Sequence, residues 1–435
     1  MSGRGRSRLR AAAGVLLVAA IGASAAGRAR AQSATLAAFD EVWQTINDTF
    51  DDPSFGGIDW AGVRRGLRPR VERATTDAEG RAVIREMLAR VGRSHFALLG
   101  PPADGDGPRG DATVPITIRP AGDAMLIVAV EAGSTAAAAG LAAGDRLIEI
   151  DDRTIADIVA PVNAPDDRVR ALLSWRRVTN ALSGAAGARA HLRVRAPGGA
   201  ERIVDVGRVT EGGVPVAFGN LPVMRVRFDA QERRTPAGRR VGAIAFNLWM
   251  PAIAEPFASA IDRFRSADGL VIDLRGNPGG LADMIRGIAG HIVSEPLVIG
   301  RMHTRAGELE FRANPRRSTS DGRRVEPFAG PVAVLVDGLT GSTSECFAGG
   351  LQSLGRVRVV GTTTMGQALP ASTKTLSNGD VLMYAIGDFV TSTGVRLEGR
   401  GVVPDEIVSL EPAALAAGHD AMAAALAWLD RAGAR

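Results

Sequence analysis

The 435-residue chain contains one lysine, Lys374, and one cysteine, Cys346. A single cysteine excludes a disulfide bond within the chain. Because Lys374 is the only lysine, the positive charge comes almost wholly from arginines, which are scattered along the sequence. Aromatic residues make up only 4% of the chain. Because nucleic-acid binding needs basic residues clustered together with aromatic ones, we interpret the basicity as compositional bias and expect no nucleic-acid partner.

Long apolar runs are absent beyond the N-terminal region, so we expect no integral membrane segment in the mature chain. The N-terminus itself has a basic stretch, an apolar run over residues 11–26 and the tripeptide Ala-Arg-Ala at 29–31. This order is typical of a secretory signal with an A-x-A cleavage site, and the run is short for a membrane span. We predict a signal peptide over residues 1–31, a mature start at Gln32 and a periplasmic or extracellular location.

The mature chain has the composition of a globular protein, with 46% hydrophobic and 23% charged residues. Its length predicts two or three domains. Apolar residues recur at spacings of three and four through much of residues 32–100, which predicts a helical N-terminal region. A Pro- and Gly-rich linker follows at 101–110. We expect a C-terminal helix within residues 411–435.

Strands and helices alternate over much of residues 215–410, which indicates an α/β core with a parallel sheet. Within it, residues 331–351 read as a strand, a turn rich in Gly and hydroxyl residues, and a helix. A serine on such a turn is lifted clear of the backbone and faces the positive end of the helix dipole. The stretch is thus a candidate site for a nucleophile, or alternatively a helix opening with Ser344 as N-cap.

A second Gly-rich turn follows the apolar strand in residues 269–280, which end in Asn277-Pro278-Gly279-Gly280. Glycines allow close approach and positive φ, so the backbone N–H groups of this turn can face a ligand. The turn lacks the G-x-x-x-x-G-K-S/T and G-x-G-x-x-G patterns of phosphate-binding loops. We therefore interpret it as an oxyanion cradle.

Residues 111–210 contain the pattern G-S-x-A-A-x-A-G-L-x-x-G-D-x-L-x-x-I-D from Gly133 to Asp151. This segment resembles the circularly permuted PDZ domains of bacterial proteases. Such a domain has an open strand edge that accepts a peptide as an added strand. The segment 114–117, Val-Pro-Ile-Thr, has a proline in place of the usual Gly-containing carboxylate loop, so we expect docking of an extended peptide.

The core motifs DLRGNPGG, VLVDGLTGSTSE and GRGVVPD occur in the order found in the tail-specific or carboxyl-terminal processing proteases, and the chain resembles that family. The resemblance implies a ClpP/crotonase-like α/β core with an inserted, β-rich PDZ-like domain. It implies that Ser342 is the nucleophile. It also implies that the N–H groups of Thr343 and of the Gly279-Gly280 turn form the oxyanion hole.

A serine nucleophile needs a base within hydrogen-bond reach. At the position where processing proteases have a catalytic lysine, this sequence has Gln367, and an amide cannot accept the proton. The tricorn-like branch of the superfamily uses a histidine instead, and the resemblance to it implies His95 as general base. Ser94 and Glu398 are then the groups that orient or polarise the site.

Three alternatives remain open at this level. Lys374 is the only lysine that could form a Ser-Lys dyad with Ser342. Cys346 is a rival nucleophile, although a lone cysteine is more often a small core residue. Glu345 competes with Glu398 as the functional carboxylate, although we expect it to support the turn.

We therefore predict an exported serine endopeptidase that acts on extended or C-terminally accessible polypeptides. No metal or organic cofactor is implied. An inactive peptide- or ligand-binding protein on the same scaffold is the alternative from another functional class, because the retinoid-binding relatives in this superfamily use the fold for binding.

Overall fold

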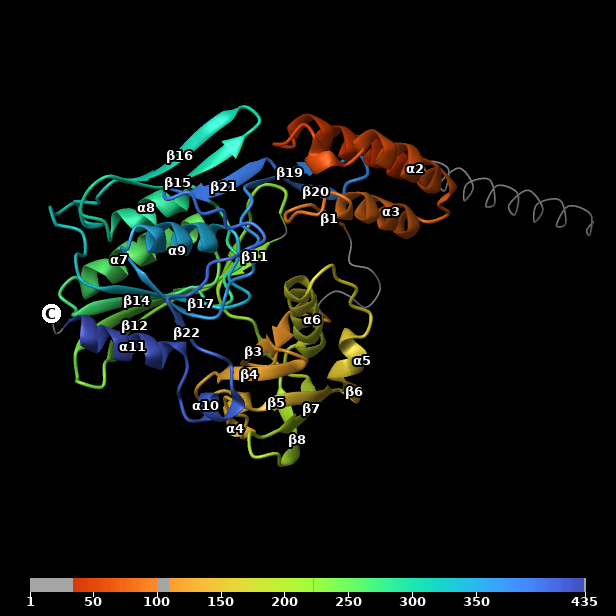
Figure 1. Cartoon of the computed structure of the whole chain (residues 1–435). Helices are drawn as coiled ribbons and strands as arrows, with labels where there is room; N and C mark the ends of the chain where they lie inside the picture. The colour runs from red at the N-terminus through yellow and green to blue at the C-terminus, as the bar shows by residue number, and fades with distance from the viewer. Residues whose placement is uncertain (1–33, 101–108, 222, 434–435) are drawn as a thin grey trace, which may run out of the picture. The chain divides into compact units, whose positions relative to one another are not determined.

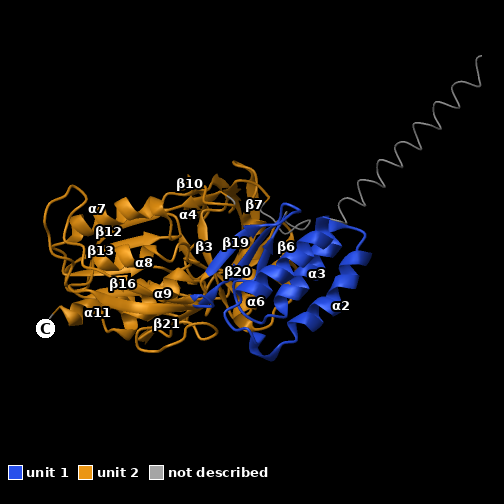
Figure 2. Ribbon diagram, turned by 90° about the horizontal axis from the view of Figure 1, so that it is seen from above, with its two compact units in different colours: residues 1–101, 304–306, 371–387 blue, residues 102–303, 307–370, 388–435 orange. Residues whose placement is uncertain are grey.

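The computed structural model describes residues 34–100, 109–221 and 223–433. The predicted signal peptide lies outside these residues. The chain divides into two compact units, coloured separately in Figure 2. Of the described residues, the first unit holds 34–100, 304–306 and 371–387, and the second unit holds the others. The hairpin at 371–387, which the predicted boundaries assign to the core, is thus grouped with the N-terminal region.

The first unit is a small helical bundle with a three-stranded antiparallel sheet (Figure 1). Residues 34–49 are helical, as the periodicity predicts. The side chains of Asp59 and Thr76 cap the next two helices by accepting from backbone N–H groups. The elements of this unit are η1 (Phe55–Gly57), α2 (Trp60–Arg73), α3 (Asp77–Ala89), β1 (Ala97–Leu99), β19 (Ala371–Thr375) and β20 (Val381–Ala385).

The second unit begins with an antiparallel sheet in the order β3-β4-β5-β7-β8, which has its own apolar core. The predicted succession of strand, short helix, Gly-Asp turn and strand is present as β4, α4, Gly144-Asp145 and β5. Its elements are β2 (Ala112–Thr113), β3 (Ile116–Ala121), β4 (Ala124–Val130), α4 (Thr135–Ala138), β5 (Arg146–Ile150), β6 (Arg153–Thr154), α5 (Ile155–Val159), α6 (Asp167–Leu182), β7 (Arg189–Arg195), β8 (Glu201–Gly207) and β9 (Val209–Thr210).

A six-stranded sheet in the order β12-β13-β14-β17-β18-β22 forms the centre of the second unit (Figure 1). The first pair is antiparallel and all other pairs are parallel, which confirms the prediction of an α/β core. The sheet consists of β12 (Phe228–Arg234), β13 (Arg240–Phe246), β14 (Gly269–Asp273), β17 (Val332–Val336), β18 (Arg358–Gly361) and β22 (Glu406–Ile407).

Helices cover both faces of this sheet, because alternate strand residues point to opposite sides. Residues such as Ile244, Ile272 and Val334 pack in one core cluster with α7 (Ala254–Phe264), α8 (Met284–Gly290) and α9 (Thr343–Ser353). Residues such as Val271 and Leu335 pack in another with α11 (Ala421–Ala432). Buried on both faces, β17 is apolar along its whole length.

The remaining elements connect or flank the core. A two-stranded pair, a three-stranded sheet in the order β16-β15-β21, a 3-10 helix and a short helix make up the rest of the unit as far as the structure describes it: β10 (Val214–Val216), β11 (Met224–Val226), η2 (Pro251–Ile253), β15 (Leu297–Thr304), β16 (Gly307–Ala313), β21 (Gly387–Thr391) and α10 (Pro412–Ala416). Among the residues that the structure describes, no helix has both the length and the apolar character that crossing a membrane requires.

Candidate active site

Ser342 lies on a sharp turn between β17 and α9. Its backbone has φ 52° and ψ −121°, and a positive φ is uncommon for a residue with a side chain. Such a conformation is costly and clusters at functional sites. Ser342 is the N-cap residue of α9, so it lies at the positive end of the helix dipole.

The alternative assignment of Ser344 as N-cap is wrong. The helix begins at Thr343, which places Ser344 inside the first turn, where it is fully buried. Its hydroxyl accepts a hydrogen bond from the indole Nε1 of Trp249 at 2.8 Å. Of the two serines, Ser342 is thus the one on the turn itself.

The Gly-rich turn after β14 lies directly against Ser342. A Cβ atom added to Gly279 would lie 2.7 Å from the Cβ of Ser342 and 3.0 Å from the backbone N of Thr343, and Gly279 has φ 106°. A Cβ on Gly280 would lie 2.4 Å from the carbonyl O of Trp249. Both positions therefore require glycine, because neighbouring parallel strands bring the two turns together at their carboxyl ends.

Two backbone donors of this cradle have no acceptor among the residues that the structure describes. They are the N–H groups of Gly280 and Thr343, whose residues are joined by a 2.7 Å hydrogen bond from Thr343 Oγ1 to the Gly280 carbonyl. The N–H of Gly279 differs, since it donates to Asn277 Oδ1 at 2.9 Å. Gly279 is thus needed for close approach, and its N–H is already engaged.

Glu345 holds the turn from inside. Its fully buried carboxylate accepts hydrogen bonds from the backbone N–H groups of Ser342, Gly366 and Gln367 at 3.0, 2.7 and 2.9 Å and from the hydroxyl of Thr364. Burial raises the pKa of Glu345 to about 7, against the effect of these four donors. Its expected role in supporting the turn is confirmed by these contacts.

In the first unit, Ser94 and His95 form a hydrogen-bonded pair, with Ser94 Oγ 2.8 Å from His95 Nδ1. They precede β1, and His95 has φ 62°, another positive value in a residue with a side chain. The imidazole is half-buried, and burial lowers the pKa of His95 to about 4. At neutral pH the ring is therefore uncharged and has a nitrogen that can accept a proton.

Comparison with protein families matches two parts of the chain. Residues 36–89 match the Tricorn protease C1 domain, and residues 240–408 match peptidase family S41. Residues 240–408 form a peptidase family S41 domain. The S41 domain contains both Gly-rich turns and Ser342, so the expected resemblance to the processing proteases is confirmed, as is the assignment to the serine-type peptidases, whose substrates are polypeptides.

Relatives of the chain agree with this assignment. A carboxyl-terminal-processing protease of Synechocystis sp. is 26% identical over 381 residues, covering 85% of this chain and 79% of the relative. The carboxy-terminal processing protease CtpB of Bacillus subtilis is 26% identical over 282 residues, covering 64% of this chain and 52% of the relative.

Solved structures share the fold. The photosystem II D1 C-terminal processing protease has a TM-score of 0.56 at 23% identity and covers 87% of this chain and 94% of its own. Mature CPAF has a TM-score of 0.60 at 15% identity, covering 93% and 97% respectively.

Gln367 and Glu398 lie in the S41 domain and follow Ser342 in the sequence. The Gln367 carbonyl accepts from the N–H of Ser342 at 2.8 Å, so its backbone is fixed beside the turn. Glu398 is half-buried, and its carboxylate accepts from the N–H of Ala368 at 2.9 Å. Glu345 thus contacts the nucleophile turn directly, whereas this bond of Glu398 holds the irregular segment around Ala368.

The rival groups have other partners. Lys374 lies on β19 in the first unit, and its Nζ donates to Thr45 Oγ1 at 3.1 Å. Cys346 is buried in α9, and burial raises the pKa of its thiol well above the ordinary value. A thiol that stays protonated is a poor nucleophile.

Sequence reasoning missed a buried ion pair beside the turns. Asp337, directly after β17, accepts from Arg119 of β3 at 2.5 Å, from the N–H of Gly276 at 2.9 Å and from the N–H of Leu339 at 3.0 Å. Burial alone would raise the pKa of Asp337, but Arg119 and these donors hold it below its usual value. Asp337 thus hydrogen-bonds to both Gly-rich turns. The only sequence signal for this role was its position at the end of a strand.

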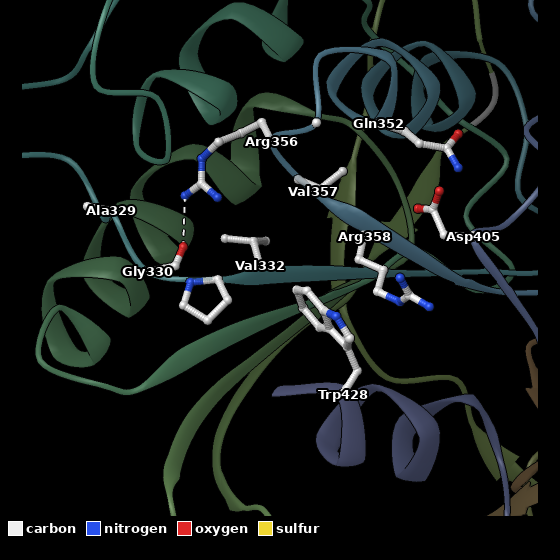
Figure 3. A pocket seen from close by; sticks show the side chains of 11 residues that line it. Ala329, Gly330, Val332, Gln352, Arg356, Val357, Arg358, Asp405 and Trp428 are labelled. Carbon is white, nitrogen blue, oxygen red and sulfur yellow. Dashed lines mark hydrogen bonds between the residues drawn. The ribbon is translucent and has the colours of Figure 1, made fainter. Parts of the chain in front are cut away.

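A pocket of about 400 Å³ lies at the other end of the parallel strands, between Val332 at the start of β17 and Trp428 of α11 (Figure 3). Arg356, which lines it, donates to the carbonyl of Gly330 at 3.1 Å. Since Ser342 follows the opposite end of β17, this pocket is separate from the nucleophile turn.

Proposed function

We propose that the protein hydrolyses peptide bonds through Ser342, with His95 as general base. The observation that carries the proposal is the strained turn of Ser342, which lies beside two backbone donors without an acceptor in the described chain, those of Gly280 and Thr343. A nucleophile next to a preorganised oxyanion hole is the arrangement that acyl transfer requires.

In the proposed mechanism, His95 Nε2 takes the proton of the Ser342 hydroxyl, and Oγ attacks the carbonyl carbon of the substrate. The N–H groups of Gly280 and Thr343 stabilise the negative oxygen of the tetrahedral intermediate. The imidazolium then returns its proton to the leaving amine. In the second half of the reaction, His95 takes a proton from water, whose oxygen attacks the acyl carbonyl carbon. The ester bond to Ser342 then breaks, the imidazolium returns the proton to Ser342 Oγ, and the acyl group leaves as a carboxylic acid.

The Ser94 contact supports His95 in this role. When Nδ1 carries the ring proton, it donates to Ser94 Oγ, and Nε2 is then the basic nitrogen. Burial lowers the pKa of His95, which keeps the ring neutral at pH 7 and leaves the lone pair of Nε2 available, while the same shift makes Nε2 a weaker base. We assign Glu398 to the orientation of the site, through the backbone of Ala368.

The alternatives have weaker support. Lys374 donates to Thr45 within the first unit, and the thiol of Cys346 is buried and stays protonated. An amide at Gln367 cannot act as base. We therefore favour the Ser-His mechanism over a dyad of Ser342 with Lys374.

The substrate is proposed to be an extended polypeptide. We interpret residues 111–210 as a PDZ-like domain and the S41 domain as a ClpP/crotonase-like core. β3 is an edge strand of its sheet, and an edge strand offers unpaired N–H and C=O groups to a peptide. With the proposed signal peptide at 1–31, the protein is proposed to be exported and to act in the periplasm or outside the cell.

A fluorophosphonate probe tests the proposal. The wild-type protein should be labelled, Ser342→Ala should not be, and Ser353→Ala should be labelled normally, because Ser353 lies at the far end of the same helix and donates to Gly350. Absence of labelling in folded wild-type protein would contradict the proposal and favour a binding protein on this scaffold.

A further inference from the structure

We propose that Trp249 and the hydroxyls of Thr343 and Ser344 are positioning residues that aim the N–H of Gly280 at the reacting carbonyl. This inference rests on the proposed function. None of these side-chain groups is assigned to the chemistry itself. Their hydrogen bonds, together with the backbone that joins Thr343 to Ser344, form a ring around Gly280, and each bond has a defined geometric effect.

The backbone of Trp249 is hydrogen-bonded to the peptide groups on both sides of Gly280. Its N–H donates to the carbonyl of Gly279 at 2.9 Å, and its carbonyl accepts from the N–H of Leu281 at 2.8 Å. In a planar trans peptide, the carbonyl of Gly279 and the N–H of Gly280 point in opposite directions. By holding that carbonyl, Trp249 fixes the direction in which the Gly280 N–H points.

The side chain of Trp249 links these backbone hydrogen bonds to α9, the helix that follows the nucleophile. Its Nε1 donates to Ser344 Oγ at 2.8 Å, and both side chains are fully buried. Ser344 lies two residues after Ser342 in the first turn of α9. The hydrogen bond therefore sets the distance between the Trp249 backbone, which holds the peptide groups of Gly280, and the turn that carries Ser342.

Thr343 closes the ring from the other side. Its hydroxyl donates to the carbonyl of Gly280 at 2.7 Å, while its own N–H is the second proposed oxyanion donor. Both donors are thus fixed relative to each other by contacts from the same three residues. A preorganised pair of donors stabilises the oxyanion without reorganisation during the reaction.

Trp249 also packs in the core, where its ring centroid lies 5.0 Å from that of Phe246 and 5.2 Å from that of Phe347. A phenylalanine at this position keeps most of that packing and removes the Nε1–H donor. Trp249→Phe therefore separates positioning from packing. Trp428→Phe is the matched control, because Trp428 lines the pocket at the opposite end of the strands.

The test measures the maximal rate and the half-saturating concentration of fluorophosphonate labelling, together with the melting temperature. Because losing one oxyanion donor costs about 10²–10³ in rate, a misaimed donor should slow the maximal rate about tenfold in Trp249→Phe, with half-saturation unchanged. Ser344→Ala should slow it similarly. The double variant Trp249→Phe/Ser344→Ala should be no slower than the slower single variant, because both changes remove the same hydrogen bond.

Thr343 supplies a rescue experiment. Thr343→Val removes the donor to Gly280 and should slow labelling, whereas Thr343→Ser keeps a hydroxyl and should restore most of the rate. Trp428→Phe and Ser353→Ala should label at the wild-type rate.

Two results would overturn the inference while leaving the proposed function intact. One is an active wild type whose Trp249→Phe variant melts lower but keeps its maximal labelling rate, which indicates packing alone. The other is a double variant whose losses multiply, which indicates two separate effects. An unlabelled wild type, by contrast, overturns the proposed function and this inference with it.

Discussion

At the scale of single residues, the site depends on glycines and one strained serine. Ser342 and Gly279 have positive φ values and touch each other, so neither tolerates a change that adds bulk at the contact. The sequence patterns predicted both Gly-rich turns because turn chemistry is local. They did not predict the N-cap, because three neighbouring hydroxyl residues each satisfy the capping preference and only the helix start distinguishes them.

Gly279→Ala is the sharpest test of this contact. The added methyl group would lie 2.7 Å from the Cβ of Ser342, so the turn must shift. We expect a loss of labelling rate of about 100-fold, the scale of a lost oxyanion donor. Gly287→Ala in α8 is the control, because its Cβ meets no atom within 4 Å and should leave labelling unchanged. Equal rates in both variants would refute the close approach.

The pH dependence also belongs to single residues. Glu345 accepts its four hydrogen bonds as a carboxylate, and below pH 7 it takes up a proton, since its pKa is about 7. His95 takes up a proton only near pH 4 and then cannot act as base. On acidification, the labelling rate should therefore fall in two steps, near pH 7 and near pH 4.

Glu345→Gln provides the control for this profile. It should label more slowly at all pH values and show only the lower step, because the amide does not titrate. A single step near pH 6.5, the ordinary histidine pKa, in the wild type would contradict the assignment of both values.

At the scale of elements, the antiparallel sheet that contains β3 and the S41 core are joined by the pair of Arg119 on β3 and Asp337 after β17. The two residues are 218 positions apart, and both are buried. The sequence predicted the strand that ends just before Asp337, because apolar runs are a local signal. It does not reveal which strand ends meet, so this pair was beyond sequence reasoning.

Arg119→Met should destabilise the second unit strongly. Removing one partner of a buried ion pair costs about 3–5 kcal/mol, because the remaining charge is left unpaired. Since Asp337 also holds Gly276 and Leu339, labelling of Ser342 should slow as well. Denaturant unfolding and the labelling rate measure the two effects.

Arg195→Met is the matched control. Arg195 on β7 pairs with Glu201 on β8, both side chains are exposed, and exposed pairs contribute about 0–1 kcal/mol. Equal unfolding free energies for the Arg119 and Arg195 variants would show that the buried pair does not stabilise the unit.

At the scale of the whole molecule, the groups assigned to the reaction come from different units. Ser342, Thr343, Gly280 and Glu398 belong to the second unit, whereas Ser94-His95 belongs to the first (Figure 2). The hairpin 371–387 lies within the S41 part of the sequence, but it is grouped with the first unit. Sequence reasoning did not foresee this, because strand patterns carry no information about the unit that a hairpin packs against.

The central claim is that His95 activates Ser342, and the rate of fluorophosphonate labelling in two single variants tests it most directly. His95→Ala should lower the rate at pH 7 by about 100-fold or more, in the range of general-base catalysis, while Lys374→Ala should label at the wild-type rate. Circular dichroism should confirm that both variants are folded. The reverse pattern, a folded His95→Ala that labels normally and a folded Lys374→Ala that does not, would contradict the account.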